Sequence, residues 1–150
     1  MDFKELIETL GEKTGIGKGL ELDEENRCLI EFDGMGVLMQ GIDEAHAATF
    51  LAQVGEPPPD RQERLYRALL EANHAFGGTF GATLSLDPAS GLVCLCKTLD
   101  TAAMDGERFC GELEAFLNAL EDWRTVLADY RAASPEAEDE SPVPDHAIQV

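Results

Sequence analysis

Residues 2 to about 14 carry apolar side chains three and four positions apart, which is the spacing of one helix face. The side chains on this face are Phe3, Leu6, Ile7 and Leu10. Gly15 and Gly17 follow and predict the end of the helix, because glycine readily adopts the backbone angles of a helix terminus. A helix this short is marginal alone, so we expect its apolar face to dock on another element.

A second helical pattern extends from residue 60 to about 76, directly after three prolines at 57–59 that cannot continue a strand. Asp60 is the expected N-cap, and Glu63 completes a pattern like a capping box. The apolar positions are Leu65, Leu69, Leu70 and Phe76. Gly77 and Gly78 predict the end of this helix.

The longest helical pattern covers residue 105 to about 131, with apolar residues spaced alternately by four and three. They are Phe109, Leu113, Phe116, Leu120, Trp123, Leu127 and Tyr130. Such a seam is typical of a coiled coil, but a helix that covers a sheet uses the same seam for its core. We favour the core interpretation and keep the coiled coil as the alternative.

Between these helices the apolar period changes to two, which predicts five strands. Residues 27–32, 36–42 and 46–54 form the first three, with turns at Asp33–Gly34 and at residues 43–44. The third strand is the weakest prediction because its alanine-rich start could be helical. Residues 79–86 and 92–99 form a hairpin, since Pro88 and Gly91 suit a short connecting loop.

The order of the elements predicts an α+β fold, α-βββ-α-ββ-α, in which helices flank an antiparallel sheet. A chain of 150 residues has room for one core, so we expect one domain over residues 1–132. Residues 133–150 have no apolar period, three prolines, five acids and no Lys or Arg. This composition predicts a disordered acidic tail.

The net charge of −19 narrows the partners that the chain can bind. Such a surface repels phosphate backbones and anionic lipids, so we expect no nucleic acid partner. The sequence has no apolar run of roughly eighteen residues and no signal peptide pattern, which predicts a cytoplasmic protein without membrane insertion. The acidity suits a basic or unfolded protein partner, or it acts only as a solubility device.

No group of residues has the spacing of a catalytic or metal site. The four cysteines, at 28, 94, 96 and 110, form no CxxC pair, and we expect reduced, buried thiols. Glu71 and His74 have no visible nucleophile partner, and the glycines at 77–81 follow a helix instead of a strand, the reverse of a phosphate loop. We therefore predict no enzyme and no cofactor, but a protein that grips another chain through strand edges or apolar grooves.

Several short motifs, in this order and spacing, resemble one family. They are GEKTGIG at 11–17, NRC at 26–28, FD at 32–33, LLEAN at 69–73, GG at 77–78, LSLDP at 84–88 and Trp123 in the last helix. Over about residues 3–130 the chain resembles class I type III secretion chaperones of the Tir chaperone (CesT-like) family. The resemblance implies a bacterial, cytoplasmic homodimer that binds the N-terminal region of a secreted effector and keeps it extended for export. The acidic tail is not part of the family pattern.

The resemblance also implies which residues bind. The effector groove would use the first helix and the first three strands, with these candidates: Phe3, Leu6, Ile7, Leu10, Cys28, Ile30 and Phe32, or the alternate residues Leu29 and Leu38. Which face of the strands is open stays undecided at this point, and the alanine-rich third strand would make a shallow groove wall. The dimer interface would use Leu65, Leu69, Phe80, Leu84 and Leu86. Each of these residues could instead be plain core, and the alternative function is a regulatory or structural interaction module without a secretion client.

Overall fold

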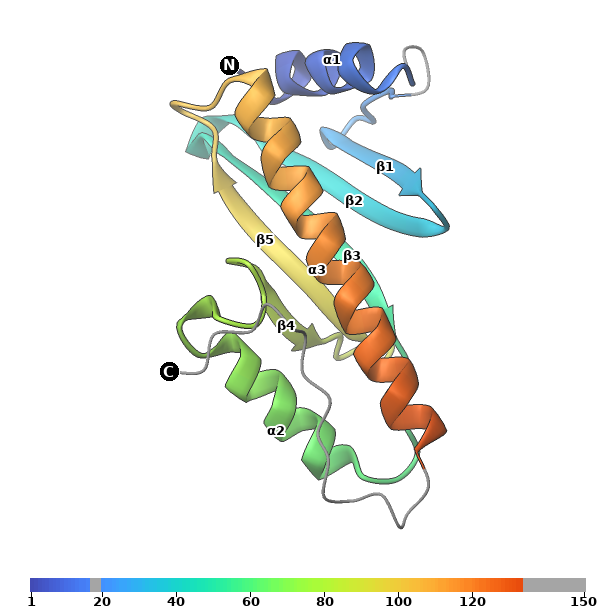
Figure 1. Cartoon of the computed structure of the whole chain (residues 1–150). Helices are drawn as coiled ribbons and strands as arrows, with labels where there is room; N and C mark the ends of the chain where they lie inside the picture. Colours follow the sequence, from blue (N-terminus) through green and yellow to red (C-terminus); the bar gives the residue numbers. More distant parts are fainter. Residues whose placement is uncertain (17–19, 134–150) are drawn as a thin grey trace. The chain divides into compact units, whose positions relative to one another are not determined.

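The computed structural model describes residues 1–16 and 20–133, so the predicted tail at 134–150 lies outside the described residues. Its helices and strands follow the predicted order (Figure 1). They are α1 (Phe3–Thr14), β1 (Arg27–Phe32), β2 (Met35–Ile42), β3 (Ala47–Gly55), α2 (Gln62–Asn73), β4 (Thr83–Leu86), β5 (Val93–Asp100) and α3 (Gly106–Ala132). Two short 3-10 turns, η2 (Asp43–Ala45) and η3 (His74–Phe76), precede β3 and follow α2.

The five strands form one sheet in the order β1-β2-β3-β5-β4, and the pairs β1–β2, β2–β3 and β4–β5 are antiparallel. The predicted α+β class is therefore confirmed. The Asp33–Gly34 turn between β1 and β2 is also confirmed, since both residues have the positive φ that a tight hairpin needs. The chain divides into two compact units, residues 1–52 with 97–116 and residues 53–96 with 117–150. We call them unit 1 and unit 2 and describe each separately.

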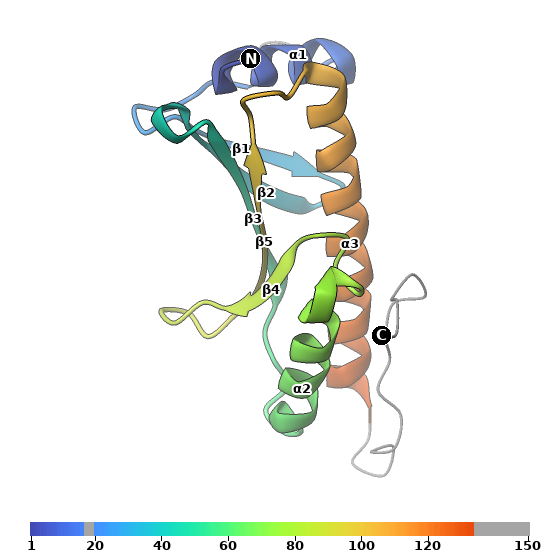
Figure 2. The same cartoon turned by 90° about the vertical axis from the view of Figure 1, so that its left-hand side faces the viewer.

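Unit 1 buries α1 and the start of α3 against one face of β1, β2 and β3. An Asp2–Glu5 capping box begins α1, and Gly15, with φ of 75°, ends it as predicted. Three edge-on ring contacts tie the layers together: Phe3 to Phe109 at 6.3 Å, Phe50 to Phe109 at 5.5 Å and Phe50 to Phe116 at 5.4 Å. Figure 2 shows the start of α3 along one side of these strands, and among the described residues of unit 1 no α-helix lies on their other face.

Unit 2 packs α2 and the second half of α3 together with β4. The seven seam residues of α3 are all buried, three in unit 1 and four in unit 2, which confirms the core interpretation. Trp123 donates its indole N–H to the carbonyl oxygen of Gly78 at 2.8 Å. This buried hydrogen bond fixes the loop after α2 to the middle of α3.

The start of α2 differs from the prediction. The N-cap is Arg61, with a left-handed φ of 57°, and Asp60 makes no capping bond. Arg61 instead reaches the end of α3, where its guanidinium donates to the carbonyl oxygens of Tyr130, at 3.0 Å, and Ala133. The segment before α2 is thus positioned by α3, and this long-range contact overrides the local capping signal at Asp60 and Glu63.

The predicted strand at 79–86 is too long, because only Thr83–Leu86 pairs with β5. Gly78 packs so closely on Ala72 that a Cβ at Gly78 would lie 2.8 Å from the Ala72 Cβ. The carbonyl of Gly78 is already bonded to Trp123, and Phe80 and Gly81 both have positive φ. Residues 77–82 therefore turn instead of extending. The second helix also ends earlier than predicted, at Asn73.

Candidate functional site: an open leucine row and an exposed helix face

Three leucines form a row across the uncovered face of unit 1. Leu29 on β1 pairs directly with Leu38 on β2, and Leu38 pairs with Leu51 on β3. Because side chains alternate along a strand, these leucines point away from the face covered by α1 and α3. Leu29 is 69% exposed and Leu51 43% exposed, and Leu38 between them is half-buried. We call Leu29, Leu38 and Leu51 the leucine row.

Polar residues border the leucine row on one side. Arg27, Gln40 and Thr49 are paired in the next register position of the same three strands. Arg27 forms ion pairs with Asp23 at 3.0 Å and with Glu25 at 2.9 Å. The backbone N–H of Arg27 also bonds to the Asp23 carboxylate and holds the pKa of that carboxyl below its ordinary value. The contacts of Arg27 with Asp23 and Glu25 therefore hold the Arg27 side chain in place along this border.

The other border of the leucine row has little side-chain bulk. Glu31 on β1 pairs with Gly36 on β2, so these two strands offer one carboxylate there and no second side chain. A Cβ at Gly36 would lie 3.8 Å from the Leu29 Cδ1 atom, an ordinary contact distance. The row is thus an apolar stripe that runs across the strands. Polar side chains border it on one side, and Glu31 and Gly36 border it on the other.

The structure separates the nine predicted groove residues by face. Phe3, Leu6, Ile7 and Leu10 of α1 are buried in the core of unit 1, and so are Cys28 and Ile30 of β1. Phe32 is half-buried at the end of β1. The two alternate candidates, Leu29 and Leu38, lie on the open face.

Leu51 completes the row, and the sequence prediction did not include it. The signal was available, because Leu51 alternates with Phe50 and Ala52, both of which are buried. The inward positions of β3 carry Ala48, Phe50 and Ala52. Its outward positions carry Thr49, Leu51 and Gln53.

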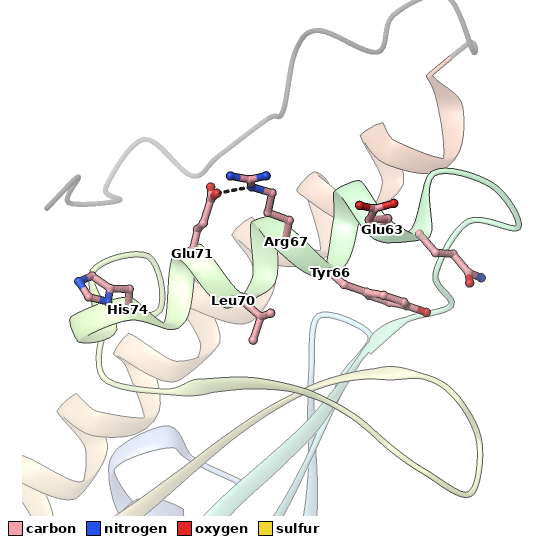
Figure 3. Close-up of a pocket in the computed structure, with 7 residues that line it drawn as sticks. Glu63, Tyr66, Arg67, Leu70, Glu71 and His74 are labelled. Atoms are coloured by element: carbon pink, nitrogen blue, oxygen red, sulfur yellow. Dashed lines mark hydrogen bonds and ion pairs between the residues drawn. The ribbon is translucent and has the colours of Figure 1, made fainter.

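A second apolar surface lies on α2 in unit 2. Leu70 is 71% exposed, and a shallow surface cavity beside it is lined by Gln62, Glu63, Tyr66, Arg67, Leu70, Glu71 and His74. In Figure 3, Tyr66 and Leu70 lie on one side of α2 and the Arg67–Glu71 ion pair, 2.9 Å long, lies on another. We call the side chains of Tyr66, Arg67, Leu70 and Glu71 the α2 face; Tyr66 is half-buried and the other three are exposed.

The loop after α2 exposes two aromatic side chains. Phe76 is 54% exposed, and Phe80 is also exposed. Ala75, Phe76 and Phe80 all have left-handed φ values between 53° and 57°, which are uncommon for residues with a side chain. Strained backbone that holds large apolar groups in solvent is typical of a contact site.

The predicted dimer residues also divide by exposure. Leu65, Leu69 and Leu84 are buried inside unit 2, whereas Phe80 and Leu86 are exposed. Leu70 and Phe76 are exposed as well, although the sequence placed both on the apolar stripe of the helix. Leu69 lies on the buried side of α2 with Leu65 and Ala68, whereas Leu70 lies about 100° further around the helix, on its exposed side.

The described part of the chain shows no grouping of side chains that suits chemistry. Among residues 1–16 and 20–133, no three His, Cys, Asp or Glu side chains converge as metal ligands. All four cysteines are free, with Cys28 and Cys94 buried and Cys96 and Cys110 half-buried. None of the helices in these ranges is long and apolar enough to cross a membrane.

Comparison with known proteins gives one family and several similar structures. The family model of the Tir chaperone protein (CesT) family matches residues 5–124. A chain of the ExsC–ExsE complex is 24% identical, with a TM-score of 0.69, over 81% of this chain and 90% of that one. A chain from the complex of the Yersinia pestis type III secretion chaperone SycH with a fragment of YscM2 is 19% identical, with a TM-score of 0.65, over 83% and 98%.

A chain of the HopA1–SchA chaperone–effector complex is 17% identical, with a TM-score of 0.65, over 82% of this chain and 94% of that one. At these identities the solved structures show a shared fold. No curated protein sequence matches the chain.

Proposed function

Because the chain belongs to the Tir chaperone protein (CesT) family, we propose that it is a cytoplasmic type III secretion chaperone whose leucine row binds the N-terminal region of a secreted effector. Family membership places the chain among chaperones and not among enzymes. The observation that supports this site is the pairing of Leu29, Leu38 and Leu51 in one register on an uncovered sheet face.

The geometry of the leucine row favours a particular kind of client segment. Neighbouring strands are about 4.8 Å apart, so the three leucines lie one strand spacing apart across the sheet. One helical turn rises about 5.4 Å. A client segment that places an apolar residue on each successive turn, as an amphipathic helix crossing the strands does, would meet each leucine in turn. Burying such side chains contributes about 25 cal/mol per Å² of apolar surface.

The buried apolar side chains of α1 have a supporting role in the proposed client site. Phe3, Leu6, Ile7 and Leu10 support the strands from the inner face, where they are at most 2% exposed. They would therefore contact a client only if α1 left its place in unit 1. The role we give them is to hold the sheet whose outer face carries the leucine row.

The α2 face and the aromatic loop after it are the proposed homodimer surface. Leu70, Phe76, Phe80 and Leu86 give unit 2 exposed apolar side chains that a second copy would cover. Buried aromatic anchors supply much of the affinity of protein interfaces. The net charge of −19 keeps a protein with two such apolar surfaces soluble.

The test is co-purification of the chain with the N-terminal segment of a candidate effector, beginning with the product of a neighbouring gene. We expect the double variant Leu29→Asp/Leu51→Asp to lose the client by at least about tenfold in affinity, because two buried apolar contacts become desolvated carboxylates. Both positions are exposed, so the variant should fold. Ile30→Asp is unsuitable because Ile30 is core.

Leu70→Asp is the matched control, since it places the same change on the α2 face. We expect each chain of this variant to bind the client with unchanged affinity. The variant should sediment as a monomer, because the proposed dimer surface is disrupted. Unchanged effector affinity in the leucine-row variant, with the dimer intact, would reject the leucine row as the client site.

A further inference from the structure

The described chain ends beside the first turn of α2. The Arg61 guanidinium, only 11% exposed as a side chain, donates to the carbonyl oxygens of Tyr130 and Ala133. Ala133 is the last described residue, and Arg61 is the N-cap of α2. Residues 134–150 therefore start from a point held next to the N-terminal end of the α2 face, within the same unit.

These remaining residues are long enough to follow the whole helix. About seventeen residues reach at most roughly 55 Å when extended, at about 3.3 Å per residue. The twelve residues of α2 span about 18 Å, at 1.5 Å per residue. The segment can thus cover the α2 face with most of its length to spare, so no stretching opposes the contact.

Among the α-helices that the structure describes, α2 is the least acidic within its bounds, so it repels an acidic segment least. Residues 134–150 hold five acids and no Lys or Arg. In α1 and α3 the acids outnumber the bases, whereas α2 has two of each and Arg61 immediately before it. Arg61, Arg64 and Arg67 are three of the eleven basic residues in the chain, and the Arg67 side chain is 80% exposed.

The two surfaces also match in their apolar groups. Tyr66 and Leu70 supply apolar area on the α2 face, and Val143, Ile148 and Val150 supply it in the segment. The family match ends at residue 124 and so does not include the segment.

We propose that residues 134–150 fold back onto the α2 face of their own chain and compete there with the second copy. This regulatory contact rests on the proposed use of the α2 face for dimerisation. The tethered segment always acts at a high effective concentration, whereas the second copy must be present at a sufficient concentration to displace it. Dimerisation is then suppressed at low protein concentration and released when the acids of the segment are neutralised.

The test uses the full chain with four acids of the segment changed to amides, Glu136→Gln, Glu138→Gln, Asp139→Asn and Glu140→Gln. We expect the dimer dissociation constant to fall by roughly tenfold, because the tethered segment then competes less with the second copy for the α2 face. General repulsion between two acidic chains would also weaken when charge is removed. The matched control therefore removes four exposed acids elsewhere, Glu8→Gln, Glu12→Gln, Glu114→Gln and Glu121→Gln. Equal tightening in both variants would overturn the proposal.

A second measurement does not depend on dimerisation. At concentrations below the dimer dissociation constant, backbone amide NMR shifts at residues 62–74 should differ between the unmodified chain and the segment variant. They should be unchanged in the matched control. Identical shifts in all three proteins would overturn the contact, and so would differences that appear only as concentration rises. Absence of a dimer in every protein would reject the dimer proposal alone, since the NMR comparison still decides the contact.

Discussion

Gly41 lies where the N-terminal end of α1 crosses β2 in unit 1. A Cβ at this position would overlap the Phe3 side chain and lie 2.6 Å from the Asn26 amide nitrogen. The backbone is equally constrained, because the Gly41 N–H donates to the Asn26 carbonyl and the Asn26 side chain donates to the Gly41 carbonyl. Neither neighbour can move away without losing a bond or exposing Phe3, so this glycine sets how closely α1 approaches the sheet.

We expect Gly41→Ala to destabilise the protein by about 1–3 kcal/mol, because an added methyl group overpacks a filled core. Urea denaturation measures the change. Gly36→Ala on the same strand is the control, because its methyl group would meet Leu29 at an ordinary 3.8 Å and should change stability by about 0.5 kcal/mol or less. Equal effects at the two glycines would show that strand propensity, not the approach of α1, accounts for the loss.

At the scale of elements, β4 depends on a side chain of α2. The Asn73 carboxamide accepts a bond from the Leu84 N–H at 2.9 Å and donates to the Leu84 carbonyl at 3.0 Å. One side chain thus satisfies both main-chain groups that Leu84 turns away from β5. Without it these groups would lack a protein partner at the edge of the sheet.

Asn73→Ala should cost about 1–3 kcal/mol, because it leaves a donor and an acceptor of β4 without their partners. Hydrogen exchange at Leu84 should become faster in the variant than in the unmodified chain, and urea denaturation gives the stability change. Asn73→Asp is the informative comparison, since it keeps the acceptor for the Leu84 N–H but replaces the donor with a charged oxygen next to the Leu84 carbonyl. If the Leu84 amide stays equally protected in all three proteins, another group holds β4 in place.

The sequence predicts the α-helices and strands of this chain, but not all of their ends. Period and turn chemistry gave all eight helices and strands in order, because patterns such as those of α1 and α3 reflect burial directly. The start of α2 could not be read locally, since the Arg61 contact comes from residues 130 and 133. The length of β4 was likewise decided by Trp123, which occupies the Gly78 carbonyl from more than forty positions away.

The candidate site was harder to predict than the fold. Alternation in β1 separates Leu29 from Ile30, but it does not say which of the two faces is covered. That choice is made by α1 and α3. Phe109 and Phe116 of α3 pack on Phe50, and Phe3 of α1 packs on Phe109, so these helices close one face. The openness of the leucine row is therefore a consequence of tertiary packing, and the sequence prediction named only Leu29 and Leu38 of its three residues.

At the scale of the whole molecule, buried thiols make stability depend on alkaline pH. Burial raises the pKa of Cys28 and Cys94 and of the half-buried Cys110 above the ordinary value of 9.0. Above that value the unfolded chain loses thiol protons that the folded chain keeps. The folded state then binds more protons than the unfolded state, so stability falls as pH rises.

We expect the free energy of unfolding to fall above about pH 9, by at most about 1.4 kcal/mol per pH unit for each thiol. Urea denaturation between about pH 7 and about pH 10.5 measures this slope. The variant Cys28→Ala/Cys94→Ala/Cys110→Ala should lose part of the slope and keep only what other groups contribute. If the two slopes are the same, the thiols titrate alike in the folded and unfolded chains.

The carboxamide of Asn73 has a further consequence for assembly. A protein that offers uncovered sheet to other chains is at risk of joining its own copies edge to edge, and a fibre grows only when each sheet presents two open edges. The strand order leaves β1 and β4 as the edges, and at Leu84 the β4 edge is already occupied from within. Asn73 thus blocks the addition of another strand to β4 at Leu84. A further strand could then pair only with β1, which disfavours polymers.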